Sequence, residues 1–595
     1  MAVGFDFGTT NSLISVILRG RAIDVMDDDG LPFPSVVRYE GERVVVGRAA
    51  KESLDEAGLG VYGNTVRSPK FLLGDESVQV GGVERSPVDI VSDVVRHVKS
   101  QSLKGRQAKV LAGVSQAVVT IPVNMTGPRR AALRDAFRRA DIGIVQFVHE
   151  PFAALYGYVR GQADTKESLR ALNRRNVLVV DWGGGTLDLT LCRIEGGRAV
   201  QLRNGGSDEV GGDRFDEAIR NEVIRRFSAS AGIPDDAYIH PDAKLRLLQD
   251  AETNKIALSE RSAVSFYRPD FFSQPAATLE YRLTREELDE VTRPLIMSGM
   301  REIDSLLESV GIGPSQIAMC LVAGGMAAMP AIRGRLHELF GPQRVDIPSN
   351  SSTLIAQGAA WIAHDASRLQ LAKPIELQLS RGAYLPLVKA GTDMPAEHEE
   401  KRQKVHLFCT DPTDGVAKFE VCAPSFPTAS PQISDPRTPL GMLTVDVDAR
   451  AKPLTERLEL EVILDDDLIL RARAWSAMAK DDDATVIHDL EFGLRLPGIN
   501  DGACSDAEPS LDEPPHRSGG LSVRANIADT ADDALVPGDV LYKHRPSAFE
   551  RSQIRNKATE DQIWEHLYYQ PCAVCRRSAN DPGCRCATDP QPRAR

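Results

Sequence analysis

The sequence lacks any long hydrophobic run. A helix that crosses a bilayer needs about 20 consecutive apolar residues, and no segment of this 595-residue chain approaches that length. The first residues lead directly into the apolar segment Ala2–Phe7, without the basic and hydrophobic regions of a secretory signal. These absences predict a cytoplasmic protein that has no membrane partner.

The chain also lacks an excess of positive charge. Its formal net charge of -13 at pH 7 argues against a protein whose main partner is nucleic acid. Apolar residues make up 42% and charged residues 26%, which is ordinary for a globular protein. Because 595 residues exceed what one hydrophobic core can organise, we expect three or four domains.

Cysteine is scarce except near the C-terminal end. Cys572, Cys575, Cys584 and Cys586 are grouped there, and the other cysteines are scattered, as buried thiols are in a reducing compartment. Four thiolates at these spacings can surround a tetrahedral Zn²⁺. The group predicts a zinc site, or else a tail in which the cysteines gather by chance. Flanking arginines leave contact with nucleic acid or an acidic partner as a weaker alternative.

One short loop pattern occurs twice. The runs Asp6–Asn11 and Asp181–Thr186 each follow an apolar segment and contain Asp, a bulky residue, Gly and Thr. Glycine lets backbone N–H groups approach an anion closely, and threonine hydroxyls add hydrogen bonds. A carboxylate beside phosphate makes sense if Mg²⁺ lies between them and is held through its waters. The repeat therefore predicts two facing loops that hold the phosphates and the metal of a nucleotide.

This interpretation assigns individual residues. Phosphate or cofactor contact is expected of Gly8, Thr9, Thr10, Asn11, Gly183, Gly184, Gly185 and Thr186, and the metal shell of Asp6 and Asp181.

The order of apolar and polar segments predicts an α/β domain over residues 1–368, with two similar lobes and a cleft between them. A helix is expected at Arg129–Arg139, and the polar segment Gln162–Asn176 reads as a surface loop. The next part, residues 375–498, has short strand candidates separated by turns, which is typical of a β-sandwich-like domain.

Three further segments complete the predicted organisation. Residues 369–374 form an interdomain linker, and residues 499–547 form a second, flexible linker rich in Asp, Pro, Ser and Gly. Residues 548–595 hold a short helix and the cysteine-rich tail.

With these motifs in view, the chain resembles the 70-kDa heat-shock chaperones (DnaK type) of the actin/hexokinase ATPase superfamily. Besides the two loops, the resemblance rests on segments between about residues 3 and 365: Asn64-Thr65-Val66 with Lys70, Val119–Pro122 with Arg129-Arg130, His149–Ala154, Gly211–Asp216, Leu321–Gly325 and Gly358–Ala360.

The resemblance implies site residues. It makes Lys70, Glu150, Asp181 and Thr186 catalytic, and it gives nucleotide contact to Gly211, Gly212, Glu252, Lys255, Ser259, Gly324, Gly325 and Met326. Lys70 can stabilise negative charge at the γ-phosphate, and Glu150 can orient Mg²⁺ or the attacking water. Without the family pattern, Lys70 would read as a surface lysine and Glu150 as a helix N-terminal carboxylate.

The adenosine end of the site departs from the family. Met326 replaces a hydroxyl-bearing residue, Ala328 and Ile256 replace arginines, and Ser352 replaces an aspartate. A stacked arginine contributes about 0.5–2 kcal/mol. We therefore expect weaker ATP binding than the family pattern implies.

The regulatory segments depart as well. The linker around Leu369 and Leu371 lacks the family's acidic end, and Gln146 stands where many members have an arginine used by J-domain partners. Dependence on a J-domain co-chaperone or a nucleotide exchange factor is therefore not implied.

The resemblance implies an ATP-dependent, chaperone-like protein of protein folding and the stress response. ATP binding with Mg²⁺ and slow hydrolysis to ADP would be coupled to binding of unfolded peptide or a dedicated client by the β-rich domain. The alternative is a non-hydrolysing nucleotide sensor that serves as a scaffold for one partner. A small-molecule kinase is disfavoured, because no acidic residue clearly marks a substrate hydroxyl.

Overall fold

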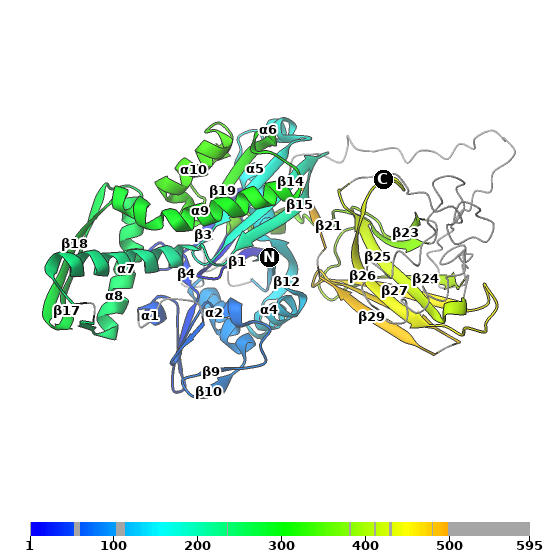
Figure 1. Cartoon of the computed structure of the whole chain (residues 1–595), viewed down its shortest axis with the longest axis horizontal. Helices are drawn as coiled ribbons and strands as arrows, with labels where there is room; N and C mark the ends of the chain where they lie inside the picture. The colour runs from blue at the N-terminus through cyan, green and yellow to red at the C-terminus, as the bar shows by residue number, and fades with distance from the viewer. Residues whose placement is uncertain are drawn as a thin grey trace, which may run out of the picture. The chain divides into compact units, whose positions relative to one another are not determined.

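The computed structural model describes residues 2–52, 60–102, 114–234, 236–379, 382–409, 412–427, 431–478, 480–488 and 490–497. The described chain divides into two compact units. Unit 1 runs to Leu369 and resumes at Gly493, and unit 2 runs from Gln370 to Phe492. The predicted linker 499–547 and the tail with its four grouped cysteines lie outside the described residues. In the structure the chain is a mixed α/β protein with several sheets, as the sequence predicts (Figure 1).

Unit 1 contains two main sheets with related topology. The first has the strand order β12-β11-β1-β2-β3, and the second has the order β20-β19-β13-β14-β15, followed by β30 and then by β21 (Leu369–Leu371). In the first sheet β1 pairs antiparallel with β2 and parallel with β11. In the second, β13 pairs antiparallel with β14 and parallel with β19. The repeated loop of the sequence is therefore a repeated strand connection at the same place in two sheets.

The strands of these sheets are mostly buried, because helices cover parallel sheets on both faces. Their bounds are β1 Ala2–Phe7, β2 Asn11–Leu18, β3 Arg21–Val25, β11 Gln116–Ile121, β12 Gly143–His149, β13 Asn176–Trp182, β14 Leu187–Glu195, β15 Arg198–Ser207, β19 Ile317–Ala323, β20 Val345–Asp346 and β30 Phe492–Arg495. Smaller sheets contain β4 Phe33–Pro34 (paired with β2), β5 Val36–Glu40, β6 Arg43–Val46, β7 Gly60–Tyr62, β8 Thr65–Arg67, β9 Val78–Val80, β10 Val83–Arg85, β16 Tyr238–Ile239, β17 Ala263–Gln274 and β18 Ala276–Thr284.

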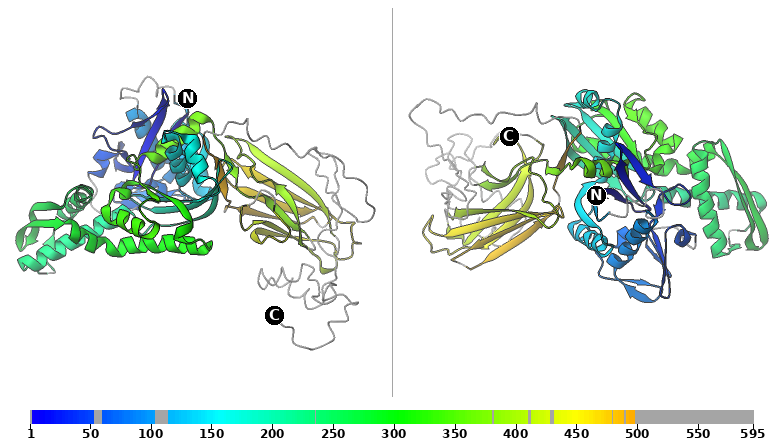
Figure 2. Two further views of the ribbon diagram at one scale, coloured as in Figure 1. Left: turned by 90° about the horizontal axis from the view of Figure 1, so that it is seen from above. Right: turned by 180° about the vertical axis from the view of Figure 1, so that it is seen from behind.

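The helices of unit 1 pack around these sheets. They are α1 Arg48–Lys51, α2 Pro87–Ser102, α4 Gly127–Arg139, α5 Glu150–Gly161, α6 Thr165–Leu172, α7 Gly212–Ala231, α8 Pro241–Leu258, α9 Arg285–Ser309, α10 Pro330–Phe340 and α11 Leu354–Asp365, with 3-10 turns at Pro69–Leu72, Pro314–Gln316 and Gly325–Ala328. The helix expected at Arg129–Arg139 is α4. The views of Figures 1 and 2 agree that α7, α8, β17 and β18 form a projecting part of unit 1.

The prediction of a loop over Gln162–Asn176 is wrong, because α6 lies within it. The side chain of Asp164 caps this helix by accepting a hydrogen bond from the backbone N–H of Glu167 at 3.0 Å. Leu169 and Leu172 are buried, so this polar segment is an amphipathic helix.

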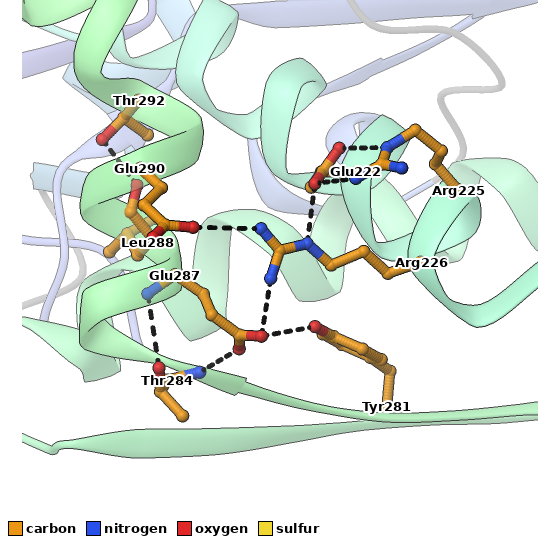
Figure 3. A network of polar contacts seen from close by, with 9 residues as sticks. All are labelled: Glu222, Arg225, Arg226, Tyr281, Thr284, Glu287, Leu288, Glu290 and Thr292. Atoms are coloured by element: carbon orange, nitrogen blue, oxygen red, sulfur yellow. Dashed lines mark hydrogen bonds and ion pairs between the residues drawn. The ribbon is translucent and has the colours of Figure 1, made fainter. Parts of the chain in front are cut away.

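A polar network fixes the projecting part (Figure 3). Arg226 on α7 donates to Glu222 on the same helix at 2.7 Å and to Glu287 on α9 at 2.6 Å. Glu287 also accepts from Tyr281 and closes a capping box with Thr284 at the start of α9. The guanidinium of Arg226 thus joins α7 to α9 and fixes the arrangement of these two helices.

Unit 2 is built of two four-stranded sheets, and its described residues include no α-helix. One sheet has the order β23-β22-β25-β26 and the other β24-β27-β28-β29. The sheets meet where Thr444 N donates to the side chain of Asp483 at 2.8 Å. Their bounds are β22 Ile375–Leu379, β23 Ala383–Val388, β24 Glu400–Phe408, β25 Val416–Pro424, β26 Arg437–Asp446, β27 Arg457–Asp465, β28 Leu470–Ser476 and β29 Asp482–Ile487, with a 3-10 turn at Pro412–Asp414.

The boundaries of the β-rich part differ from the expected range of 375–498. The short strand β21, Leu369–Leu371, crosses from unit 1 into unit 2, and the chain is back in unit 1 from Gly493. The sequence does not reveal that the chain returns to unit 1, because four residues can form a strand without specifying which sheet the strand joins.

Helices α5 and α11 approach each other too closely for a side chain between them. A Cβ at Gly358 would overlap the carbonyl oxygen of Ala153, whereas a Cβ at Gly334 on α10 would meet no atom within 4 Å. We expect Gly358→Ala to destabilise unit 1 by at least about 3 kcal/mol, because neither backbone can move away. Gly334→Ala should be neutral or should stabilise by up to about 1 kcal/mol. Chemical denaturation of both variants checks this, and equal stabilities would contradict the packing described.

Candidate nucleotide and metal site

The two repeated loops lie against each other. A Cβ at Gly184 would be 2.9 Å from Thr10 Oγ1, and a Cβ at Gly185 would be 3.0 Å from Thr9 Cγ2. A Cβ at Gly8 would be 2.3 Å from the carbonyl oxygen of Asn11 in its own loop. Residues about 175 positions apart in the sequence therefore form one surface of backbone and hydroxyl groups. The hydroxyl of Thr10 is buried and has no hydrogen-bond partner in the described structure, as expected of a group that awaits a ligand oxygen.

Four carboxylates gather behind these loops. Glu150, Asp181 and Asp188 are at most 7% exposed, and Asp6 is partly buried. Thr120 donates to Asp6 at 2.7 Å, and Thr186 donates to Asp188 at 2.8 Å. The sequence interpretation did not assign Asp188, although it stands two residues after Thr186 in the motif. Its place opposite Asp181 in the β13–β14 pair is the feature that could have revealed it.

The crowding raises the pKa values of the three aspartates. Burial, followed by the charge of Glu150, raises the pKa of Asp6 to about 6 and that of Asp188 to about 7. Burial also holds the pKa of Asp181 well above its usual range, and Glu150, Asp188 and Asp6 add to this effect. Desolvation and like charges both disfavour the ionised forms. A cation that enters this space would restore the ionised state.

Lys70 lies among the carboxylates. Its ammonium is 3.0 Å from Glu150 Oε1 and donates to the carbonyl oxygen of Phe7 at 2.6 Å. The side chain is 5% exposed, so Lys70 is not the surface lysine of the alternative interpretation, and Glu150 is likewise buried at the start of α5. One lysine offsets only part of the negative charge of four acids.

These groups fit a hydrated divalent cation. The described residues contain no cluster of three or more His, Cys, Asp or Glu side chains that could hold a metal ion directly. Mg²⁺ commonly keeps several of its waters and takes few protein ligands beside phosphate oxygens. The candidates to hold such an ion through water are Asp6 and Asp181, with Asp188 added by the structure.

A second group of expected residues lies around the N-terminus of α7. Lys255 donates to the carbonyl oxygen of Gly212 at 3.0 Å and pairs with Asp216 at 2.8 Å. A Cβ at Gly212 would be 2.9 Å from the sulfur of Met326. Gly211 backs directly onto Gly185 of the second loop. Lys255, Gly211, Gly212 and Met326 are thus brought next to the phosphate loops.

Of the remaining expected residues, some lie next to the loops and others do not. Gly324, at φ 84°, packs its Cα against Trp182 and Asp181, where a Cβ would be 2.6 Å from the Asp181 side chain. Gly325 follows it and has no atom within 4 Å of the Cβ position. Ser259 follows the end of α8, where its backbone N–H donates to the Ile256 carbonyl at 3.1 Å. No described contact joins its side chain to the others.

Three of the four substituted positions at the adenosine end carry apolar side chains, and the fourth is Ser352. Ile256 is 62% exposed next to Lys255 on α8. Ala328 is also exposed, and Met326 is buried at 4% exposure. The apolar replacements therefore surround the part of the site where the family pattern has cationic and hydroxyl groups.

Two ion pairs link the parts of unit 1 on either side of the loops. Lys51 on α1 pairs with Glu252 on α8 at 2.7 Å, and Arg67 on β8 pairs with Asp213 on α7 at 2.6 Å. The Arg67–Asp213 pair was not predicted from the sequence, because its members are 146 positions apart. Both pairs hold α7 and α8 toward the residues that precede Lys70.

Comparison with protein families gives one clear result. The family model described as Hsp70 protein matches residues 2–79 and 73–377, which is more than half of the chain. The chain belongs to the Hsp70 family. This membership confirms the resemblance seen in the motifs and supports a chaperone-like, ATP-binding role.

Two kinds of Hsp70 relative resemble this chain. The chaperone protein DnaK of Mycoplasma mycoides subsp. mycoides SC is 29% identical over 423 residues, which cover 69% of this chain and 67% of the relative. HscA homologues of Pseudomonas paraeruginosa and Azotobacter vinelandii are each 31% identical and cover 60% of this chain. The match spans only 57% of the length of the HscA relatives.

A search of the described residues finds no helix both long and apolar enough to cross a membrane. The longest, α9, covers Arg285–Ser309 and carries charged residues along its length.

One buried histidine borders the site. His149 ends β12 directly before Glu150, is 3% exposed and stacks on the ring of Phe152. Burial, followed by the charge of Arg130, lowers its pKa to about 3. The folded chain therefore keeps His149 neutral, whereas the unfolded chain protonates it below about pH 6.5.

This difference predicts a pH dependence. The folded pKa is depressed, so its contribution to stability is present above the unfolded pKa and is lost as the pH falls through and below 6.5. Between pH 7 and pH 5 the wild type should lose about 2 kcal/mol more unfolding free energy than His149→Asn. Denaturation at both pH values measures the difference. The exposed His364→Asn serves as the control, and parallel losses in wild type and His149→Asn would contradict the assignment.

Proposed function

We propose that this Hsp70-family chain is an ATP-dependent, chaperone-like ATPase. In this proposal unit 1 binds ATP with Mg²⁺ and hydrolyses it slowly, and unit 2 binds an extended peptide or a partner protein. The observation that supports it most is the contact of the two repeated loops in front of four crowded carboxylates and Lys70.

The proposed roles follow from these contacts. Backbone N–H groups of Gly8, Gly184 and Gly185, with the hydroxyls of Thr9 and Thr10, bind the phosphates, while the N–H of Gly183 closes the second loop on the Thr186 carbonyl. Bound Mg²⁺ supplies the positive charge that lets the phosphates approach the acids.

Lys70 and Glu150 carry the proposed chemistry. The Lys70 ammonium stabilises the negative charge on the transferred phosphoryl group, and Glu150 accepts a hydrogen bond from the attacking water and orients it. Asp181, Asp188 and Thr186 fix the geometry of the second loop, where Thr186 is already hydrogen-bonded to Asp188.

Unit 2 offers sheet edges for the proposed peptide binding. Strands β23 and β24 each stand at one end of a strand order, whereas β26 and β29, at the other ends, meet each other. An extended peptide can add to such an edge through backbone hydrogen bonds, with side-chain pockets for specificity. Exposed apolar side chains of unit 2, among them Phe426 and Ile433, suit an apolar client.

One observation favours the alternative function, a nucleotide-sensing scaffold that does not hydrolyse ATP. Lys70 and Glu150, the two residues proposed to act in hydrolysis, are paired with each other in this structure. In the scaffold, that pair would persist when nucleotide binds.

Single-turnover hydrolysis separates the two functions. We expect Lys70→Ala to lower the rate of phosphate release by at least about 100-fold, because charge stabilisation in the transition state is lost. The exposed Lys166→Ala removes one lysine elsewhere and should leave the rate unchanged. Hydrolysis by wild type that is absent, or that is insensitive to Lys70→Ala, would favour the scaffold.

Restoring an arginine at the adenosine end should raise the affinity for ATP. Ile256→Arg restores a cation that can stack on a purine ring, worth about 0.5–2 kcal/mol, so the ATP dissociation constant should fall about 2- to 30-fold. Ile433→Arg adds the same charge at an exposed residue of unit 2 and should have no effect. Calorimetric titration with ATP and Mg²⁺ tests this, and an unchanged constant in Ile256→Arg would count against an adenine pose near α8.

A further inference from the structure

The chain enters and leaves unit 2 by two anchored segments. The exit linker is Ser367–Leu369, and the return segment is Phe492–Leu496. Each makes defined contacts with unit 1, so unit 2 is inserted into unit 1 and does not simply follow it.

The return segment extends the second sheet of unit 1. Gly493, Leu494 and Arg495 pair antiparallel with Val200, Ala199 and Arg198 of β15. Leu496 N then donates to the carbonyl oxygen of Gly197 at 2.8 Å. Leu494 is fully buried and Leu496 is 2% exposed. The edge of β15, which would otherwise present unpaired backbone groups, is thus covered by the chain itself.

Strand pairing and one glutamine side chain hold the exit linker, since β21, which begins at Leu369, pairs with the return strand β30. Gln146 on β12 donates from Nε2 to the Ser367 carbonyl at 2.6 Å and accepts at Oε1 from Leu369 N at 3.3 Å. Leu369 is fully buried. The amide matches both a backbone acceptor and a backbone donor, which a guanidinium, having donors only, could not do.

The outgoing and returning parts of the chain also contact each other, both within unit 1 and within unit 2. Within unit 1, the Ser367 hydroxyl donates to the Arg495 carbonyl at 3.1 Å. Within unit 2, Ala372 N donates to the Glu491 carbonyl at 2.9 Å, and Lys373 forms an ion pair with the Glu491 side chain. The exit and return paths are therefore neighbours in each unit.

We propose that Phe492–Leu496 is a second interdomain connection, which uses the edge of β15 as its binding surface and holds the exit linker on unit 1. A strand fixed at its backbone resists displacement more than a single flexible linker does. Movement of unit 1 would thus reach unit 2 through two paired segments.

The connection also lies near the proposed site. Strand β12 carries Gln146 and ends at His149, the residue before Glu150, and His149 is hydrogen-bonded to Gln201 of β15. The same strand therefore touches the exit linker and the sheet edge that binds the return segment. Control of this second connection by nucleotide rests on the function proposed above.

Hydrogen exchange of the full-length chain, read by mass spectrometry, tests the connection. Leu494→Asp places a charge at a buried position and should release the return strand. Exchange should then accelerate at least tenfold both in residues 197–201 and in residues 367–371. Leu494→Met keeps an apolar side chain of similar volume and should leave both segments within about twofold of wild type.

Ser367→Ala gives a second, milder test, because it removes the hydroxyl that bonds to Arg495 and leaves the backbone pairing of β21 with β30 in place. Loss of one hydrogen bond should accelerate exchange in both segments by about fivefold. This variant decides the question if Leu494→Asp unfolds unit 1. Unchanged exchange at 367–371 in Ser367→Ala, or in a folded Leu494→Asp whose 197–201 segment is released, would overturn the proposal.

Nucleotide provides a separate readout. With ATP and then ADP, the wild type should change exchange in both segments together, whereas Leu494→Asp should lose this joint response. If nucleotide fails to bind at all, the proposed function fails. The exchange of the variants without nucleotide still decides whether the second connection exists.

Discussion

The structure of unit 1 depends on one electrostatic constraint, the gathering of Asp6, Glu150, Asp181 and Asp188 around Lys70. The three aspartates lie on buried strands of two sheets and Glu150 begins α5, so the acids cannot move apart without disrupting both sheets. The raised pKa values of the three aspartates express the cost of this arrangement without a cation. A site that is costly without a cation and lined by facing glycine loops is suited to a metal–phosphate ligand. This is the physical basis of the proposed ATPase role.

Much of unit 1 could be predicted from the sequence, because its signals are local. The two loops show themselves as a repeated run of Asp, Gly and Thr, and the structure brings Thr10 and Gly184 into contact as the repeat implies. What sequence reasoning missed depends on pairing between distant positions. Asp188 matters because of the strand register opposite Asp181, and Arg67 because of its pairing with Asp213. Neither the register nor that pairing leaves a pattern in neighbouring residues.

The departures from the Hsp70 pattern lie in two places, at the adenosine end of the candidate site and at the exit linker. At the adenosine end, Ile256 and Ala328 replace cationic groups with apolar ones. At the linker end, Gln146 binds the backbone of Ser367 and Leu369 through both atoms of its amide. The return strand at Gly493 could not be foreseen, because its short sequence does not specify which sheet it joins. The sequence resemblance extends to the residues expected at the phosphate end, and we propose that the chain is a specialised relative with altered control.

The central claim is that a divalent cation must stand between the carboxylates and the phosphates of a bound nucleotide. Calorimetric titration of the full-length chain with ATP, once with excess Mg²⁺ and once with a chelator, tests it most directly. The account predicts measurable binding with Mg²⁺ and a dissociation constant at least about tenfold higher without it, since unscreened like charges would meet in a partly buried site. Equal affinity with and without Mg²⁺ would contradict the account, because the triphosphate would then have to bind elsewhere.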